Sequence, residues 1–317
     1  MAREVKMNKI KFAMTLTAAL ILCACNSDDA TDKGELTIAI SDAPMSGVNE
    51  VGMVLDQLVV KNQQGEEQRI TLQNREFNLL QYQGMERNLV LNKFQLKAGQ
   101  YNDAYISIVQ GDGNQGSYIN NAQGRFALEA EEGKLPLRNF QVTANKNLEM
   151  TMEINLYKAL TQQQDKFQLR HRGVWSVDNA DMGHLRGDVD AQWIADCETT
   201  YVDLADNGIF EHLAYLYPAK VTELSMMADM GSTPPDGLTE PISVGPVFQD
   251  NLGDWHFTMG YLPAGDYHVG YTCLGHLDDP EADNITDGPF VIFKDAGAVT
   301  VEAGTTGGHL NIMDCKD

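Results

Sequence analysis

The sequence contains no apolar run long enough to cross a bilayer as a helix. Its longest apolar stretch, residues 12–24, covers 13 residues, whereas a membrane-spanning helix needs about 20. Basic residues are also scarce, with 23 lysines and arginines against 45 aspartates and glutamates and a net charge of −22. A surface this acidic repels phosphate groups, so we expect no nucleic acid partner.

Motifs that mark common catalytic and metal sites are missing as well. The absence of Cys-x-x-Cys argues against a zinc ribbon or a thioredoxin-like redox pair. The sequence has no His-Glu-x-x-His, no Gly-x-Ser-x-Gly and no phosphate-binding loop, and its seven histidines are scattered. Carboxylates are plentiful, but a sequence cannot place two of them at the separation that hydrolysis needs. The pattern favours a non-catalytic protein over an enzyme.

The strongest feature that is present is an export signal at the start. Basic residues precede the apolar stretch, which ends in a box of four residues, Leu22, Cys23, Ala24 and Cys25. This box resembles the bacterial lipobox. The resemblance implies a signal peptide over residues 1–24 and a diacylglycerol group on the thiol of Cys25. The alternative is an ordinary signal peptide cleaved nearby, with Cys25 as a free thiol.

A lipid on Cys25 would decide where the protein resides. Two or more acyl chains anchor a protein stably, so we expect the membrane as a partner and a location in the cell envelope. In lipoproteins that this chain resembles, an aspartate after the cysteine retains the protein at the inner membrane. Asn26 stands there instead, which favours the outer membrane. Residues 25–34 are expected to form a polar tether.

The remaining cysteines predict one disulfide. With Cys25 lipidated, an odd number is left, namely Cys197, Cys273 and Cys315. Exported proteins fold where disulfides form, so we expect one bond and one spare thiol. Sequence alone does not fix the pairing. Our first choice is Cys197 with Cys273, which leaves Cys315 near the C-terminus.

Alternation of apolar and polar residues runs through most of the chain. Residues 36–40, 48–61 and 148–154 show it clearly, as half-buried strands do. Glycine, proline and asparagine separate these segments at short intervals, which is typical of β-sandwiches. We find no long amphipathic helix and expect short strands even at residues 200–203 and 290–293.

A polar segment at residues 179–183 predicts a domain boundary. The fold class that follows is all-β, with two consecutive β-sandwich modules of the transthyretin or immunoglobulin type. We place the first module at residues 35–180 and the second at residues 184–317.

The first module resembles a known family. Ile-Ser-Asp-Ala-Pro at residues 40–44 follows the first strand, a second strand covers 48–60, and Leu-x-Ala-Gly-x-Tyr stands at 96–101. These features are similar to those of the bacterial lipoprotein domain of unknown function numbered four-three-eight-two, over residues 35–180. The resemblance implies a β-sandwich on a lipid anchor without established activity, so it assigns no catalytic residue.

The motif at residues 96–101 recurs at residues 262–267. The recurrence indicates two related sandwiches, although so few shared positions could also arise by chance. Trp255 and Phe257 precede the second copy. This stretch is similar to transthyretin-like and carboxypeptidase-regulatory-like sandwiches.

The densest group of oxygen ligands follows Cys273, at Asp278, Asp279, Glu281 and Asp283. Carboxylates this close suit Ca²⁺. The segment lacks the glycine and glutamate spacing of an EF-hand, so an acidic surface loop is the favoured alternative. We expect no other cofactor.

Together these features favour a lipid-anchored envelope lipoprotein that acts as a non-catalytic binding or interaction module. Its ligand would be a protein or a glycan that the sequence does not identify. The alternatives are a periplasmic or surface hydrolase that uses loop carboxylates and a purely structural envelope protein.

Overall fold

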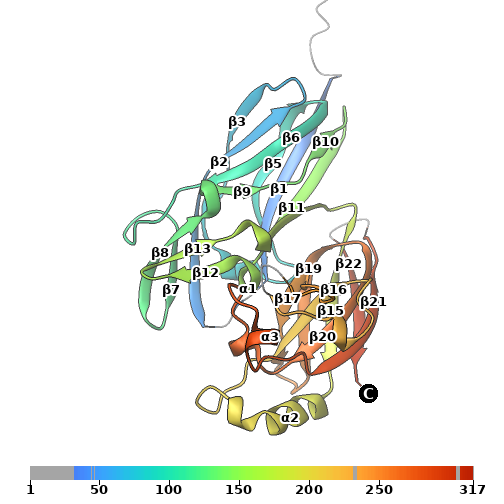
Figure 1. The fold of residues 1–317 in the computed structure, drawn as a ribbon. Coiled ribbons are helices and arrows are strands. Elements are labelled where there is room, and N and C mark those ends of the chain that lie inside the picture. The colour runs from blue at the N-terminus through green and yellow to red at the C-terminus, as the bar shows by residue number, and fades with distance from the viewer. Residues whose placement is uncertain (1–31, 44, 46, 231–233, 305–307, 317) are drawn as a thin grey trace, which may run out of the picture.

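The chain folds into two β-sandwiches, one above the other in Figure 1. The computed structural model describes residues 32–43, 45, 47–230, 234–304 and 308–316. The predicted signal peptide, the lipobox and Cys25 lie outside these residues. The predicted all-β class is confirmed, since four sheets make up the two sandwiches. Within the described residues, no helix has both the length and the apolar character needed to span a membrane.

The first sandwich contains fourteen strands: Lys33–Ala43 (β1), Val48–Asn62 (β2), Glu67–Thr71 (β3), Glu76–Asn78 (β4), Asn88–Lys97 (β5), Gly99–Ile108 (β6), Tyr118–Asn121 (β7), Gly124–Ala130 (β8), Lys134–Pro136 (β9), Phe140–Val142 (β10), Asn147–Asn155 (β11), Leu160–Gln163 (β12), Lys166–Leu169 (β13) and Val174–Asp178 (β14). One sheet has the order β14-β11-β1-β5. The other has the order β10-β6-β2-β7-β8-β13-β12, with β3 and β4 beside β2 and β9 beside β6.

The second sandwich contains eight strands: Met182–Val189 (β15), Leu213–Pro218 (β16), Ser243–Pro246 (β17), Phe248–Gln249 (β18), Trp255–Pro263 (β19), Gly265–Thr272 (β20), Lys294–Val301 (β21) and His309–Cys315 (β22). Its two sheets have the orders β18-β19-β15-β22 and β17-β16-β20-β21. Within the described ranges, no ladder pairs a strand of one sandwich with a strand of the other.

Helices are few and short. The α-helices are Leu156–Ala159 (α1), Ala191–Thr200 (α2) and Asn284–Asp287 (α3). Single 3₁₀ turns cover Leu79–Gln81 (η1), Glu131–Gly133 (η2), His171–Gly173 (η3), Val202–Leu204 (η4), Leu224–Met226 (η5) and Gly275–Leu277 (η6).

The two sandwiches share a strand arrangement. In the first, β1 lies between the antiparallel β5 and the parallel β11. In the second, β15 lies in the same way between the antiparallel β19 and the parallel β22. In both, the antiparallel neighbour continues directly into the opposite sheet, from β5 into β6 and from β19 into β20.

The repeated Leu-x-Ala-Gly-x-Tyr motif forms this crossing between sheets. The Tyr101 hydroxyl donates to the carbonyl of Lys97 at 2.9 Å, and the Tyr267 hydroxyl donates to the carbonyl of Pro263 at 2.6 Å. Each tyrosine thus returns to the residue four positions earlier and closes the corner, as conserved corner tyrosines do in other sandwiches. The motif therefore has the same structural role in both modules.

The tether predicted for residues 25–34 ends earlier than expected, because β1 begins at Lys33.

Gly34 contributes no side chain to the alternating pattern. A Cβ atom there would lie 2.2 Å from the carbonyl oxygen of Thr143. Gly183, at the start of β15, is packed equally closely against the carbonyl oxygen of Glu302. The two modules therefore also match in having a glycine packed against a backbone carbonyl at the start of the corresponding strand.

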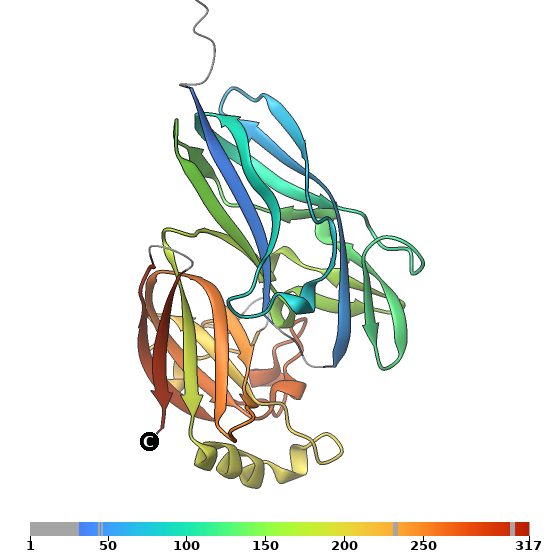
Figure 2. The same cartoon turned by 180° about the vertical axis from the view of Figure 1, so that it is seen from behind.

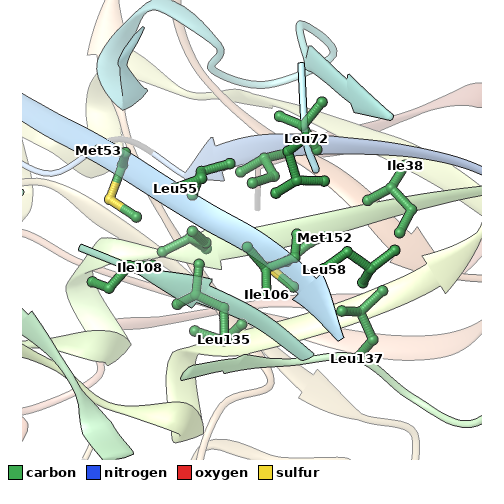
Figure 3. Packing of buried hydrophobic residues seen from close by; sticks show 14 of the residues in the cluster. Ile38, Met53, Leu55, Leu58, Leu72, Ile106, Ile108, Leu135, Leu137 and Met152 are labelled. Carbon is green, nitrogen blue, oxygen red and sulfur yellow. The ribbon is translucent and has the colours of Figure 1, made fainter. Parts of the chain in front are cut away.

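The first core lies between the two sheets of its sandwich (Figure 3). Ile38 and Met152 come from the four-stranded sheet, and Leu55, Leu58 and Ile106 come from the sheet opposite. All five are fully buried. Burial of each such side chain stabilises the fold by about 1.5–3 kcal/mol, so this apolar layer is the main source of stability in the module.

The second core is richer in aromatic side chains. Its fully buried members include Tyr215, Tyr217, Tyr271 and Phe257, together with Trp193 from α2. Tyrosine hydroxyls buried this deeply need hydrogen-bond partners. Tyr217 donates to the Ala228 carbonyl at 2.6 Å, so loops outside the sheets are attached to this core by polar contacts.

The predicted disulfide joins Cys197 of α2 to Cys273, the residue directly after β20. Their Cα atoms are 6.0 Å apart, and 76 positions separate them in the sequence. Closing a loop of this size stabilises the native state by about 4 kcal/mol in the chain-entropy account. Cys315 is the free thiol, as expected, but it lies buried at the end of β22.

Two strand predictions in the second module are wrong, and two of its elements were not predicted. Residues 200–203 belong to the end of α2 and to η4, and residues 290–293 precede β21 as irregular chain. The helix α2 went unnoticed although Asp190 caps it by accepting from the Gln192 backbone N–H at 2.8 Å. The strand β22 was also missed, because its buried positions include Asn311 whereas Ile312 is exposed.

Candidate binding cleft between the two modules

The two modules meet at a tight backbone contact. Gly260 of β19 packs against Gly84, and a Cβ atom on Gly260 would lie 1.9 Å from the Gly84 carbonyl oxygen. No side chain fits at that distance. The absence of a side chain at position 260 therefore lets the second module approach the first.

Tyr261, the next residue, is hydrogen-bonded to the first module at two places. Its carbonyl accepts from the Trp175 indole N–H at 3.1 Å, and its hydroxyl donates to the Met85 carbonyl at 2.7 Å. Its backbone has φ of 48°, a left-handed conformation that costs energy for a bulky residue. Burial raises the pKa of Tyr261 to about 12, so the hydroxyl stays protonated and keeps donating.

The short helix α1 carries a second set of contacts across the junction. Asn155, its N-cap, donates through its amide to the Ser243 hydroxyl at 3.1 Å and to the Val244 carbonyl at 2.9 Å. Lys158 donates from Nζ to the Pro241 carbonyl at 2.7 Å. Both side chains are buried, so these bonds are protected from water.

Charged contacts surround this polar patch. Arg172 of η3 pairs with Glu281 at 2.6 Å, and Arg170 lies 3.7 Å from the same carboxylate. The Tyr157 hydroxyl donates to Glu211 at 2.6 Å. First-module residues thus hold the loops at both 211 and 281 of the second module.

A cleft of about 490 Å³ opens beside these contacts. Both modules line it, with Lys158, Arg172, Trp175 and Ser176 from the first and Pro218, Lys220, Thr239, Glu240, Pro241, Ile242 and Pro263 from the second. Its volume falls within the range of small-molecule sites, about 300–1,000 Å³. The cleft exists only because the modules are docked.

The charges in the cleft are mainly positive. Lys158, Arg172 and Lys220 face a single carboxylate, Glu240, which lies 3.4 Å from the Lys158 ammonium. Burial lowers the pKa of Lys158, and the Glu240 carboxylate opposes that shift. In a chain with nearly twice as many acidic as basic residues, this cleft is a local basic region.

The predicted calcium ligands do not converge. Asp278 turns inward and accepts from the Tyr215 hydroxyl at 2.6 Å, whereas Glu281 pairs with Arg172. Asp279 accepts from the Glu281 backbone N–H at 2.9 Å, and Asp283 accepts from the Thr286 N–H at 3.0 Å. Among the residues placed by the structure, no group of three or more His, Cys, Asp or Glu could hold a metal ion.

Asp278 is instead a buried acid of the second core. Burial raises its pKa to about 7, the Tyr215 hydrogen bond opposes the shift, and the nearby Asp229 carboxylate adds to it. Asp229 itself accepts from the backbone N–H groups of Asn284 and Ile285 and so holds the start of α3. Neither acid lines the inter-module cleft.

Asp42 in the Ser-Asp-Ala-Pro segment is another buried acid. It lies inside β1 opposite Ile154 of β11, and its side chain is fully buried. Neither of its carboxylate oxygens has a hydrogen bond of normal geometry with a described residue. Burial raises its pKa well above the usual range, and the Glu153 carboxylate adds to that shift.

One part of the chain, residues 33–170, matches a family model. They match the sequence model described as Domain of unknown function (DUF4382). Residues 33–170 are a DUF4382 domain. The match confirms the resemblance seen in the sequence and ends close to the module boundary. The DUF4382 domain contributes Lys158 to the cleft, whereas Arg172, Trp175 and Ser176 lie just beyond the matched residues.

Solved structures offer only distant likenesses to the whole chain. A candidate cell adhesion protein from Bacteroides fragilis NCTC 9343 is 8% identical, with a TM-score of 0.19 over 89% of this chain and 92% of that one. The major pilin of Streptococcus pyogenes is 12% identical, with a TM-score of 0.18 over 89% and 96%. Likenesses at this level carry no argument about fold or function. No curated protein matches the chain significantly.

We predict that Gly260→Ala destabilises the junction. The added methyl group meets the backbone of Gly84, and overpacking of this kind costs about 1–3 kcal/mol. Urea unfolding should show a lower free energy of unfolding for this variant. Gly265→Ala is the control, because its Cβ would meet nothing closer than 3.7 Å. Equal stability of the two variants would contradict the close-contact account.

We also predict that Asp278→Asn changes how stability depends on pH. The native Asp278 has a pKa of about 7, against about 3.9 for an unfolded aspartate. The folded state therefore holds a proton that the unfolded state loses, and the wild type loses stability as pH rises from 4 to 7. The variant lacks this contribution, so its stability relative to the wild type should improve by about 4 kcal/mol at most between pH 4 and pH 8.

Urea unfolding at both pH values measures this difference. Asp165→Asn, which makes the same change of charge at an exposed turn position between β12 and β13, is the control and should follow the wild type. A difference between Asp278→Asn and the wild type that is the same at pH 4 and pH 8 would show that folding does not raise the pKa of Asp278.

Proposed function

We propose that the protein is a lipid-anchored, non-catalytic binding module of the bacterial envelope, and that it binds its ligand in the inter-module cleft. The observation that carries the proposal is the cleft itself. It combines a half-buried tryptophan with basic side chains, and residues of both modules form its walls. Binding sites commonly lie at such domain interfaces.

The orientation of β1 supports display away from a membrane. The strand begins at Lys33, at the end of the first module remote from the second, and runs toward the junction (Figures 1 and 2). Its 11 residues span roughly 35 Å. A lipid on Cys25 would thus attach the end opposite the second module, and the cleft at the junction would lie away from the bilayer.

The composition of the cleft favours binding over hydrolysis. Hydrolases of glycosidic bonds use two carboxyl groups on either side of the bond. Of the described residues that line the cleft, one carries a carboxylate, and that residue, Glu240, already pairs with Lys158. The raised pKa of Asp278 belongs to a buried group outside the cleft.

The anchor is tested by replacing the predicted lipidated cysteine. Cys25→Ser should abolish labelling by radioactive palmitate and should release the protein from the membrane fraction. Cys315→Ser, which removes a buried thiol, is the control and should leave labelling intact. Continued labelling of Cys25→Ser would refute the anchor.

Binding is tested with the detergent-solubilised, full-length protein. Envelope glycans and envelope proteins are screened for binding to the wild type and to the Lys220→Glu variant, in which one of the three positive charges of the cleft becomes negative. Capture that depends on Lys220 supports the proposal. If no envelope component is captured, or if capture is the same for both forms, the assignment of the cleft fails.

A further inference from the structure

The charge in the cleft is opposite to the charge of the chain. Three basic side chains and one carboxylate line it, whereas the whole chain carries 23 basic and 45 acidic residues. Clefts lined by one sign of charge concentrate ligands of the other sign. The cleft is thus suited to an anionic ligand, although the surrounding surface repels one.

The basic groups differ in how far internal contacts neutralise them. Lys158 is buried and already contacts the Pro241 carbonyl and Glu240. Arg172 donates from Nε to the Lys158 carbonyl at 2.9 Å and pairs with Glu281. Lys220 is exposed at the rim, and none of the ion pairs among the described residues includes it. Lys220 is therefore the cation most available to a ligand.

The apolar part of the cleft consists of rigid, flat groups. Trp175 is joined by Pro218, Pro241 and Pro263. The Trp175 indole N–H is already used by the Tyr261 carbonyl, so the ring is fixed in place and its contribution to a ligand is its face. A fixed aromatic face with nearby prolines suits a ring with an apolar side, as the C–H face of a sugar is.

We propose that the cleft binds an acidic saccharide, that is, a sugar ring bearing a carboxylate. Its ring stacks on Trp175, and its carboxylate lies toward Lys220 and Arg172. Thr239 and Ser176 line the same cleft and add two hydroxyl-bearing side chains to its charged donors. This inference rests on the proposed function and specifies the ligand class of the same site.

Calorimetric titration of the full-length protein tests the ligand class. The probe is a tetrasaccharide of galacturonic acid, and the comparison is the neutral galactose tetrasaccharide of the same length. The wild type should bind the acidic probe at least tenfold more tightly than the neutral one. Raising the salt concentration should weaken the acidic interaction, because salt screens exposed charges.

Two variants locate the interaction. Lys220→Glu should weaken binding of the acidic probe at least tenfold, whereas Lys97→Glu, an exposed lysine at the end of β5, should change it less than twofold. Trp175→Leu should weaken binding as well. If this variant is unstable, protection of tryptophan fluorescence from acrylamide by the probe gives the same information in a Trp255→Phe background, because the other tryptophan, Trp193, is already buried.

The outcomes separate this inference from the proposed function. Equal binding of acidic and neutral tetrasaccharides overturns the acidic class but leaves the cleft as the site. Binding of hexaglutamate, with the same dependence on Lys220 but without binding of either saccharide, overturns the saccharide. If neither saccharide binds while the screened envelope component still requires Lys220, the inference fails and the proposed function stands.

Discussion

The contact between Gly260 and the Gly84 carbonyl is the constraint on which the rest of the structure depends. It lets the two sandwiches approach closely enough for Tyr261 to hydrogen-bond to the first module through both its carbonyl and its hydroxyl. Lys158 of the first module then donates a hydrogen bond to the Pro241 carbonyl of the second. The cleft walls are therefore set by packed backbone and buried hydrogen bonds, so they hold their shape before a ligand arrives. Such preorganisation reduces the entropic cost of binding.

Buried ionisable groups are placed in and around this junction at a cost to stability. Glu153 is buried in β11 opposite Ser41, and burial raises its pKa well above the usual range. Asp42 and Asp278 show the same direction of shift. Burying a carboxyl group favours its neutral form, so all three groups weaken the fold as pH rises. The apolar cores offset this cost, and the disulfide adds its own contribution in the second module.

Much of the fold could be predicted from period-two alternation and turn residues, which gave β2 and β11 with nearly correct limits. The pairing of Cys197 with Cys273 was a choice among open alternatives, and the structure supports it. The strand β22 escaped because Asn311 is buried while Ile312 is exposed, and its pairing with β15 is a long-range contact. The cleft escaped for a related reason, since Trp175 and Lys220 are brought to it only by docking of the modules.

The DUF4382 domain is followed by a second sandwich that has the same tyrosine corner. Docking of the two modules creates the cleft, which neither module has alone. The central claim is that these modules form one rigid body. Residual dipolar couplings of the backbone amides in residues 33–178 and 182–315 test it most directly. A single alignment tensor that fits both sets is the predicted result. Two tensors that differ in magnitude would show that the modules move independently, and the cleft would then not be a preformed site.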